Sequence, residues 1–161
     1  MRQNVAPTCL SIKIVTSLIL FLTGGMLIGA FFTPELLWAG TILAIITLFC
    51  YFSAPIAYEL TGNQLSVISR FNKKVFGPVL KCSLIGKEKP SFSLRLWGNG
   101  GLFAGTGIFW NKKYGIFRAY VSTGKRFNLI LIETPESKII ITPENPKEFL
   151  AWANSSININ G

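Results

Sequence analysis

Glycines recur in one apolar and aromatic stretch of the chain, RLWGNGGLFAGTGIFWNKKYG, which spans residues 95–115. A phosphate-binding loop needs glycines spaced as G-x-G-x-x-G or G-x-x-x-x-G-K-S/T, so that backbone N–H groups converge on an anion. Neither spacing occurs, because the third glycine of the first pattern would fall on Phe103 or Trp110. Two other interpretations therefore remain for this stretch.

In the first interpretation, the bulky side chains dip into a membrane interface beside Lys112 and Lys113. In the second, the glycines supply positive φ angles and bulges at a sheet corner, and the same side chains fill the core of a β domain. The second is favoured, since these side chains would form a large exposed apolar patch if they faced water. They are Leu102, Phe103, Ile108, Phe109 and Trp110.

Residues suited to catalysis are few. The chain has no His and no Asp, which removes the commonest general base and the commonest metal ligand. The cysteines, Cys9, Cys50 and Cys82, have no metal-ligand spacing. Ser122 and Lys125 could form a Ser–Lys pair, but this spacing arises often by chance and here straddles a turn. We therefore expect a protein that is not an enzyme and that uses no cofactor or metal.

The composition is that of a membrane protein. Half of the chain is hydrophobic and 14% is charged, against roughly 25% in soluble domains. Residues 14–32 form an uncharged run that would span about 28 Å as a helix, close to the thickness of a bilayer core. A second apolar run, residues 36–52, follows after Thr33, Pro34 and Glu35, which suit a helix start.

These runs predict a transmembrane hairpin with helices at about 14–32 and 34–52, within an N-terminal unit of residues 1–55. A signal peptide is the alternative for the first run, which is longer than the usual apolar core of such peptides. The connecting loop carries only Glu35, whereas the cations lie on the other side of the hairpin. They are Arg2, Lys13, Arg70, Lys73 and Lys74. We therefore expect both termini in the cytoplasm and the hairpin in the inner membrane.

Small residues repeat at four-residue spacing in both predicted helices. Gly25 and Gly29 form one such pair, and Gly40 and Ala44 form the other. These faces allow two helix backbones to approach closely. They could pack the two helices of one chain together or form a homo-oligomer, and we weight the first interpretation more heavily.

From residue 56 onward, short β-branched and aromatic runs alternate with turn residues. Residues 56–60 and 64–70 are expected to form one hairpin, residues 117–122 and 127–134 another, and residues 138–142 a further strand. At about 146–154 an amphipathic helix is expected, with Asn145 as its cap. The sequence thus predicts an antiparallel β sandwich or barrel, spanning 56–161, with one end plugged by a C-terminal α-helix.

Residues 95–150 resemble the bacterial pleckstrin-homology-like (PH-like) domain family that follows transmembrane hairpins. The shared features are Arg-Leu before a G-x-G-G-L-F turn, then G-x-F, N-K, a Tyr before a turn, a strand ending in Glu-Thr, and a TP-E-NP-x-EF ending. The resemblance implies two nearly orthogonal sheets with a C-terminal helix, and no catalytic residues. It also implies a structural role for the matching positions. They are Arg95, Gly98, Gly100, Gly101, Phe103, Gly105, Gly107, Phe109, Tyr120, Pro143 and Phe149.

Positive charge is concentrated in the part of the β domain that is nearest in sequence to the helices. Residues 53–126 contain twelve Lys or Arg and two Glu. Contact with anionic lipid headgroups would account for this charge, although a solvated cytoplasmic face is an equally good explanation. The candidate binding residues are Arg70, Lys73, Lys74, Lys112, Lys113, Arg118, Lys125 and Arg126.

The first predicted hairpin, YELTGNQL, has no cation, so diffuse attraction to anionic lipid is expected rather than recognition of inositol lipids. A protein-interaction or regulatory subunit is the main alternative, since an exposed sheet edge allows strand addition. No RNA-binding signature is present, and nucleic acid is not expected as a partner. The sequence thus predicts a binding or scaffolding module at the inner leaflet.

Overall fold

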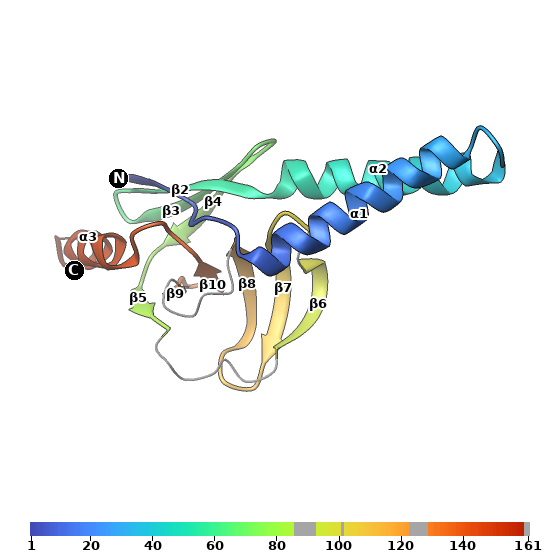
Figure 1. Ribbon diagram of the computed structural model, residues 1–161. Helices are drawn as coiled ribbons and strands as arrows, with labels where there is room; N and C mark the ends of the chain where they lie inside the picture. The colour runs from blue at the N-terminus through green and yellow to red at the C-terminus, as the bar shows by residue number, and fades with distance from the viewer. Residues whose placement is uncertain (86–92, 101, 123–128, 160–161) are drawn as a thin grey trace.

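The computed structural model describes residues 1–85, 93–100, 102–122 and 129–159. A helical hairpin projects from a β domain made of two sheets, and a C-terminal helix lies at the other end of that domain (Figure 1). The helices are α1 (Leu10–Gly29), α2 (Glu35–Ser53) and α3 (Pro146–Ile159). A PH-like sandwich with a C-terminal helix is confirmed. The alternative of a barrel is wrong, because the sheets do not close on each other.

The two N-terminal helices pack side by side, and each is long and apolar enough to cross a membrane by length and composition. α1 begins at Leu10 rather than at 14, because the apolar run marks the membrane span and not the helix start. A Cβ atom on Gly40 would lie 3.0 Å from Leu27, and one on Gly29 would lie 3.0 Å from Leu36. These two glycines therefore allow the two helices of the hairpin to pack closely.

The first sheet has the order β1-β2-β3-β4. Its strands are β1 (Arg2–Asn4), β2 (Pro55–Thr61), β3 (Gln64–Ser69) and β4 (Lys73–Pro78). The predicted β2–β3 hairpin is confirmed, and β3 and β4 are joined by a turn that contains Arg70. Strand β1 was not foreseen: it pairs with β2, and the N-terminal ammonium donates to the Leu60 carbonyl at 2.8 Å. The residues before α1 thus pair with the strands that follow α2.

The second sheet has the order β5-β9-β10-β8-β7-β6. Its strands are β5 (Lys81–Leu84), β6 (Ser93–Gly100), β7 (Gly105–Asn111), β8 (Gly115–Val121), β9 (Ile130–Glu133) and β10 (Lys138–Ile141). The predicted hairpin of residues 117–122 with 127–134 is wrong. β10 lies between β8 and β9 and runs parallel to β8. Its residues Ile139, Ile140 and Ile141 are buried on both faces of the sheet, which is typical of a central strand.

The main core lies between the sheets and is closed at one end by α3. Its members include Tyr58, Leu65 and Ile139, all fully buried. Phe149 and Ala153 of α3 are buried against them, and Leu150 and Trp152 pack at the margin. The predicted C-terminal helix is therefore confirmed, although it continues to Ile159.

A buried hydrogen-bond network joins the N-terminal segment to both sheets. The Tyr58 hydroxyl donates to the Tyr120 carbonyl at 2.5 Å, and the Thr142 N–H donates to the Tyr58 oxygen at 3.3 Å. The Ser122 hydroxyl donates to the Ala6 carbonyl. Burial raises the pKa of Tyr58 to about 12, so this phenol stays protonated at neutral pH. Ser122 is thus a structural hydroxyl in this fold, and Lys125, its suggested catalytic partner, lies outside the described residues.

Candidate functional site

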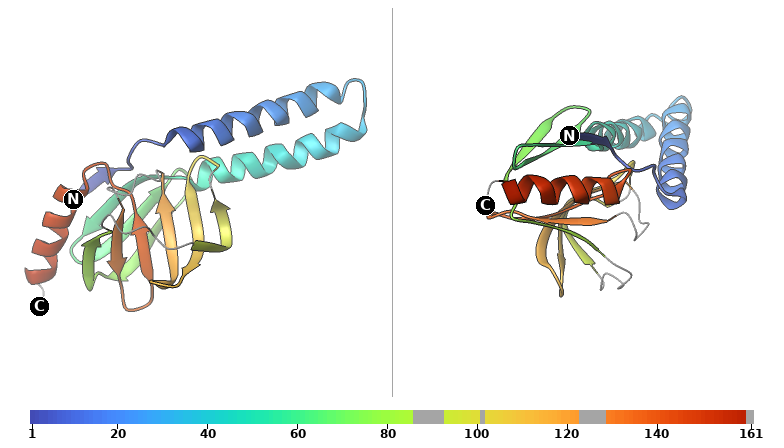
Figure 2. Two further views of the ribbon diagram at one scale, coloured as in Figure 1. Left: turned by 60° about the horizontal axis from the view of Figure 1, so that its bottom comes forward. Right: turned by 90° about the vertical axis from the view of Figure 1, so that its left-hand side faces the viewer.

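A groove of about 960 Å³ lies between the end of α2, the β3–β4 turn and the inner face of β6, β7 and β8. The end of α2 and the β3–β4 turn, which line it, lie at the end of the domain opposite α3, where the hairpin leaves the domain (Figure 2). Its volume is within the range of roughly 300–1,000 Å³ that is usual for small-molecule sites. Lys74, Arg95 and Arg118 line it, and no carboxylate is among its described lining residues.

The floor of the groove is the glycine-rich stretch. Gly98 and Gly107 face each other across β6 and β7 with φ angles of 110° and 152°, which favour glycine. A Cβ atom on Gly107 would lie 2.1 Å from the Trp97 carbonyl oxygen. These glycines are therefore a feature of the sheet, as the second interpretation expects. Of the five bulky side chains expected in the core, Trp110 is instead 40% exposed. Leu102 is buried, and Phe109 stacks on Phe117 at 5.9 Å, so both serve the domain's packing.

A bulge in β6 determines which side chains face the groove. Arg95 pairs with Phe109, but Trp97 pairs with Ile108, so one extra residue is inserted between them. Because side chains alternate along a strand, this insertion moves Trp97 to the face that carries Ile108 and Arg118. Trp97 is 77% exposed there.

Lys74 lies on the first sheet and points toward the second, and Arg118 lies on the second sheet and points toward the first. Lys74 pairs with the core residue Val67, and its ammonium lies 5.7 Å from the centre of the Tyr120 ring on β8. Conversely, the Arg118 guanidinium lies 5.9 Å from the centre of the Phe76 ring on β4. Cations over aromatic rings are weakly stabilised and keep their charge available to a ligand.

Lys73, the neighbour of Lys74, has a different role. Its ammonium forms an ion pair with Glu59 at 2.6 Å, and this contact lowers the pKa of the Glu59 carboxyl. Both side chains are at the surface, where solvent screens such pairs and they add little to stability. The adjacent lysines Lys73 and Lys74 therefore differ: the first is neutralised, and the second faces the groove.

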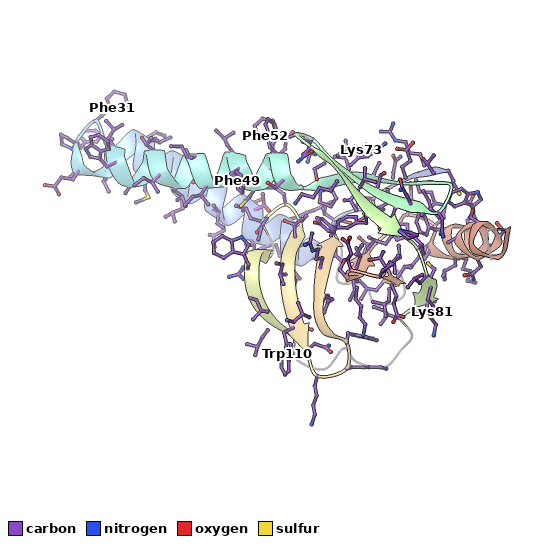
Figure 3. The ribbon with its side chains drawn as sticks, turned by 180° about the vertical axis from the view of Figure 1, so that it is seen from behind. Phe31, Phe49, Phe52, Lys73, Lys81 and Trp110 are labelled. Atoms are coloured by element: carbon purple, nitrogen blue, oxygen red, sulfur yellow. The ribbon has the colours of Figure 1, made fainter. Side chains whose placement is uncertain are left out.

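Large apolar side chains surround the groove at the hairpin side. Phe49 and Phe52 project from the last turns of α2 beside the sheets, whereas Trp110 lies at the far end of β7 (Figure 3). Phe71, in the β3–β4 turn, is 85% exposed and lines the same groove. Cations and exposed aromatic rings are thus combined at one end of the domain, as is common at membrane surfaces.

The β domain is fixed to the base of the hairpin by specific contacts. The Arg70 guanidinium donates to the Tyr51 carbonyl at 3.3 Å and lies 4.2 Å from the centre of the Tyr51 ring. The Phe103 N–H donates to the Thr16 hydroxyl at 3.1 Å, and the Phe103 ring meets the Tyr51 ring edge to face at 5.2 Å. Arg70 and Phe103 therefore orient the domain against both helices.

Of the remaining predicted binding residues, Lys112 and Lys113 do not lie at the groove. Lys112 and Lys113 are in the β7–β8 turn, where the Lys113 N–H donates to the Asn111 side chain at 2.7 Å. Lys125, Arg126 and Gly101 lie outside the described residues. Gly100 ends β6 and pairs with Gly105, while Pro143 forms a bridge with Val5. Sequence reasoning did not assign Arg95, Trp97 or Phe71 to a binding site, since their positions depend on the bulge and on strands distant in sequence.

A comparison with protein-family models matches residues 56–157 to the bacterial PH domain family. Comparisons with curated proteins and with solved structures gave no match. The match covers more than half of the chain and spans the strands from β2 to β10 and most of α3. PH domains are generally binding modules without catalytic activity, which agrees with the groove found here. By sequence and fold, the chain belongs to the bacterial PH domain family.

Proposed function

We propose that the chain is an integral membrane protein of the inner membrane, whose PH-like domain binds anionic lipid headgroups at the cytoplasmic face. Its role in this proposal is that of a binding or scaffolding module and not of an enzyme. The observation that carries the proposal is the position of the groove, with Lys74 and Arg118 facing it, beside the end of α2. A cation close to anionic lipid gains about 1 kcal/mol, and a groove at the base of a membrane hairpin is held close to the headgroups.

The charge distribution supports the cytoplasmic orientation. β1 pairs with β2, so that Arg2 lies on the same side of the hairpin as the cation-rich β domain. The opposite end of the hairpin carries Glu35. Cytoplasmic segments next to membrane helices are enriched in Lys and Arg. A cysteine introduced at Glu35 should react with an impermeant reagent on intact cells, and one at Lys112 only after permeabilisation; the reverse pattern would contradict the orientation.

The function as a lipid-binding module can be tested on the full-length chain in detergent micelles. A fragment of residues 56–161 is unsuitable, because it lacks β1 and its hydrogen bonds to Leu60. Added phosphatidylglycerol should raise the unfolding temperature more than phosphatidylcholine, and salt should reduce the difference. Equal effects of both lipids at low salt would refute anionic lipid binding.

One observation favours a protein partner as a second candidate. Leu94, Trp110 and Ile116 are exposed on the inner face of the second sheet, away from the hairpin. An apolar patch of this kind on a sheet face is typical of an interaction surface. The chain would then be a regulatory or protein-interaction subunit of a membrane complex.

A further inference from the structure

We propose that the groove holds a single anionic phospholipid, with its phosphate between Lys74 and Arg118 and its acyl chains along α2. This inference rests on the proposed function and makes it more specific. Diffuse attraction needs only surface charge, whereas a single site needs cations that converge on one place and an apolar path for the chains. Both features are present at this groove.

The two cations, Lys74 and Arg118, both point into the space between the sheets. Lys74 is on β4, an edge strand of the first sheet, and inward-pointing charges on edge strands often serve to prevent aggregation. That explanation does not apply to Arg118, because β8 is a central strand, paired with β7 and β10 on its two sides. Arg118 lies on the same face of β8 as the core residue Tyr120, and no carboxylate among the described residues pairs with it. Both cations are exposed to solvent at the opening, so a ligand phosphate can reach them and form charge-assisted hydrogen bonds.

Apolar side chains surround the groove on the hairpin side. Phe49 and Phe52 line it from α2 and are 72% and 45% exposed, and Trp97 extends the apolar rim on β6. These side chains continue directly into the apolar surface of the hairpin. A phospholipid of the inner leaflet could therefore place its phosphate in the groove while its acyl chains remain in the bilayer. This continuity favours a membrane lipid over a free phosphate.

Strands β6 and β7 form the floor of the groove. Trp97, Thr106 and Ile108 lie on the face of the second sheet that carries Arg118, and their side chains line the groove from below. Asn99 and Thr106 add polar groups to the lining. The Thr106 hydroxyl can bind a phosphate or glycerol oxygen beside the two cations, whereas the Asn99 amide already bonds with the Leu102 backbone.

The experiment is native mass spectrometry of the full-length chain in detergent, titrated with phosphatidylglycerol, phosphatidylcholine or glycerol 3-phosphate. Phosphatidylglycerol should give one saturable adduct, and glycerol 3-phosphate should bind more weakly. The Lys74→Gln/Arg118→Gln variant should lose affinity about tenfold or more, because charge-assisted hydrogen bonds are removed. Arg118→Lys alone should lose less. The matched control is Lys112→Gln/Lys113→Gln, which removes the same charge at the β7–β8 turn and should bind as the parent does.

Three outcomes would overturn the inference. If the Lys112→Gln/Lys113→Gln control loses as much affinity as the groove variant, binding is diffuse; the proposed function then stands and the single site fails. If the groove variant binds as the parent does, while circular dichroism shows that both are folded, the site is elsewhere. If phosphatidylcholine binds as tightly as phosphatidylglycerol, both the inference and the proposed function fail.

Discussion

The two ends of the β sandwich differ in the side chains that cover or line them. At one end α3 covers the opening, and Phe149 and Ala153 are buried among apolar side chains from both sheets. At the other end the opening is lined by Lys74 and Arg118 and surrounded by exposed aromatic rings. The opening covered by α3 is closed by apolar side chains, whereas the one beside the apolar hairpin combines charge with aromatic surface. The difference indicates what each end contacts.

The largest expected effect is at the closed end. Phe149→Ala removes a fully buried ring that plugs the core, and should lower the free energy of unfolding by about 3–5 kcal/mol. Denaturant unfolding of the full-length chain in micelles measures this loss. Trp152→Phe, at the margin of the same helix, is the control and should cost far less. Equal effects of the two changes would mean that α3 does not close the core.

A smaller effect is expected at the floor of the open end. Gly107→Ala forces a side chain into a backbone conformation with a φ of 152°, which costs about 1–3 kcal/mol. β6 is an edge strand and can move to relieve the contact with the Trp97 carbonyl, which limits the loss. Gly77→Ala is the control, since a Cβ atom there meets nothing within 4 Å. Unaltered stability and lipid binding in Gly107→Ala would show that the floor geometry is not required.

The core between the two ends also predicts a pH dependence. Burial raises the pKa of the Cys82 thiol from 9.0 to about 12, so the folded state holds a proton that the unfolded state releases. The resulting stability is fully present below pH 9 and is lost as the pH rises toward 12. Between pH 9 and 10 the free energy of unfolding should fall by up to about 1.4 kcal/mol because of this group. In Cys82→Ala this part of the slope should disappear; an unchanged slope would place the titration elsewhere.

The elements set by local pattern were predictable from the sequence. The apolar runs gave the two membrane-length helices, the turn residues gave the β2–β3 hairpin, and the Pro146 start with its apolar positions gave α3. The series of short motifs between Arg95 and Phe149 indicated the bacterial PH-like family. Each of these signals is contained within a short stretch of chain.

The remaining features depend on pairing between distant residues. β1 pairs with β2 across the whole hairpin, and its sequence, RQN, carries no strand pattern. β10 enters between β8 and β9, which no local turn signal indicates. The groove requires β4 and β8 to meet and the β6 bulge to rotate Trp97, so that Lys74 became a site residue and Lys112 did not.

The most direct test of membrane contact at the open end compares two tryptophans, Trp97 on β6 and Trp152 on α3, which mark the two ends. Two full-length variants would each retain one of them, with the other three tryptophans changed to Phe. They would be reconstituted in bilayer nanodiscs containing phospholipid brominated near the headgroup. Our account predicts strong quenching of Trp97 and unchanged fluorescence of Trp152, relative to unbrominated lipid. Unquenched Trp97, or quenching of Trp152 to the same extent, would contradict it.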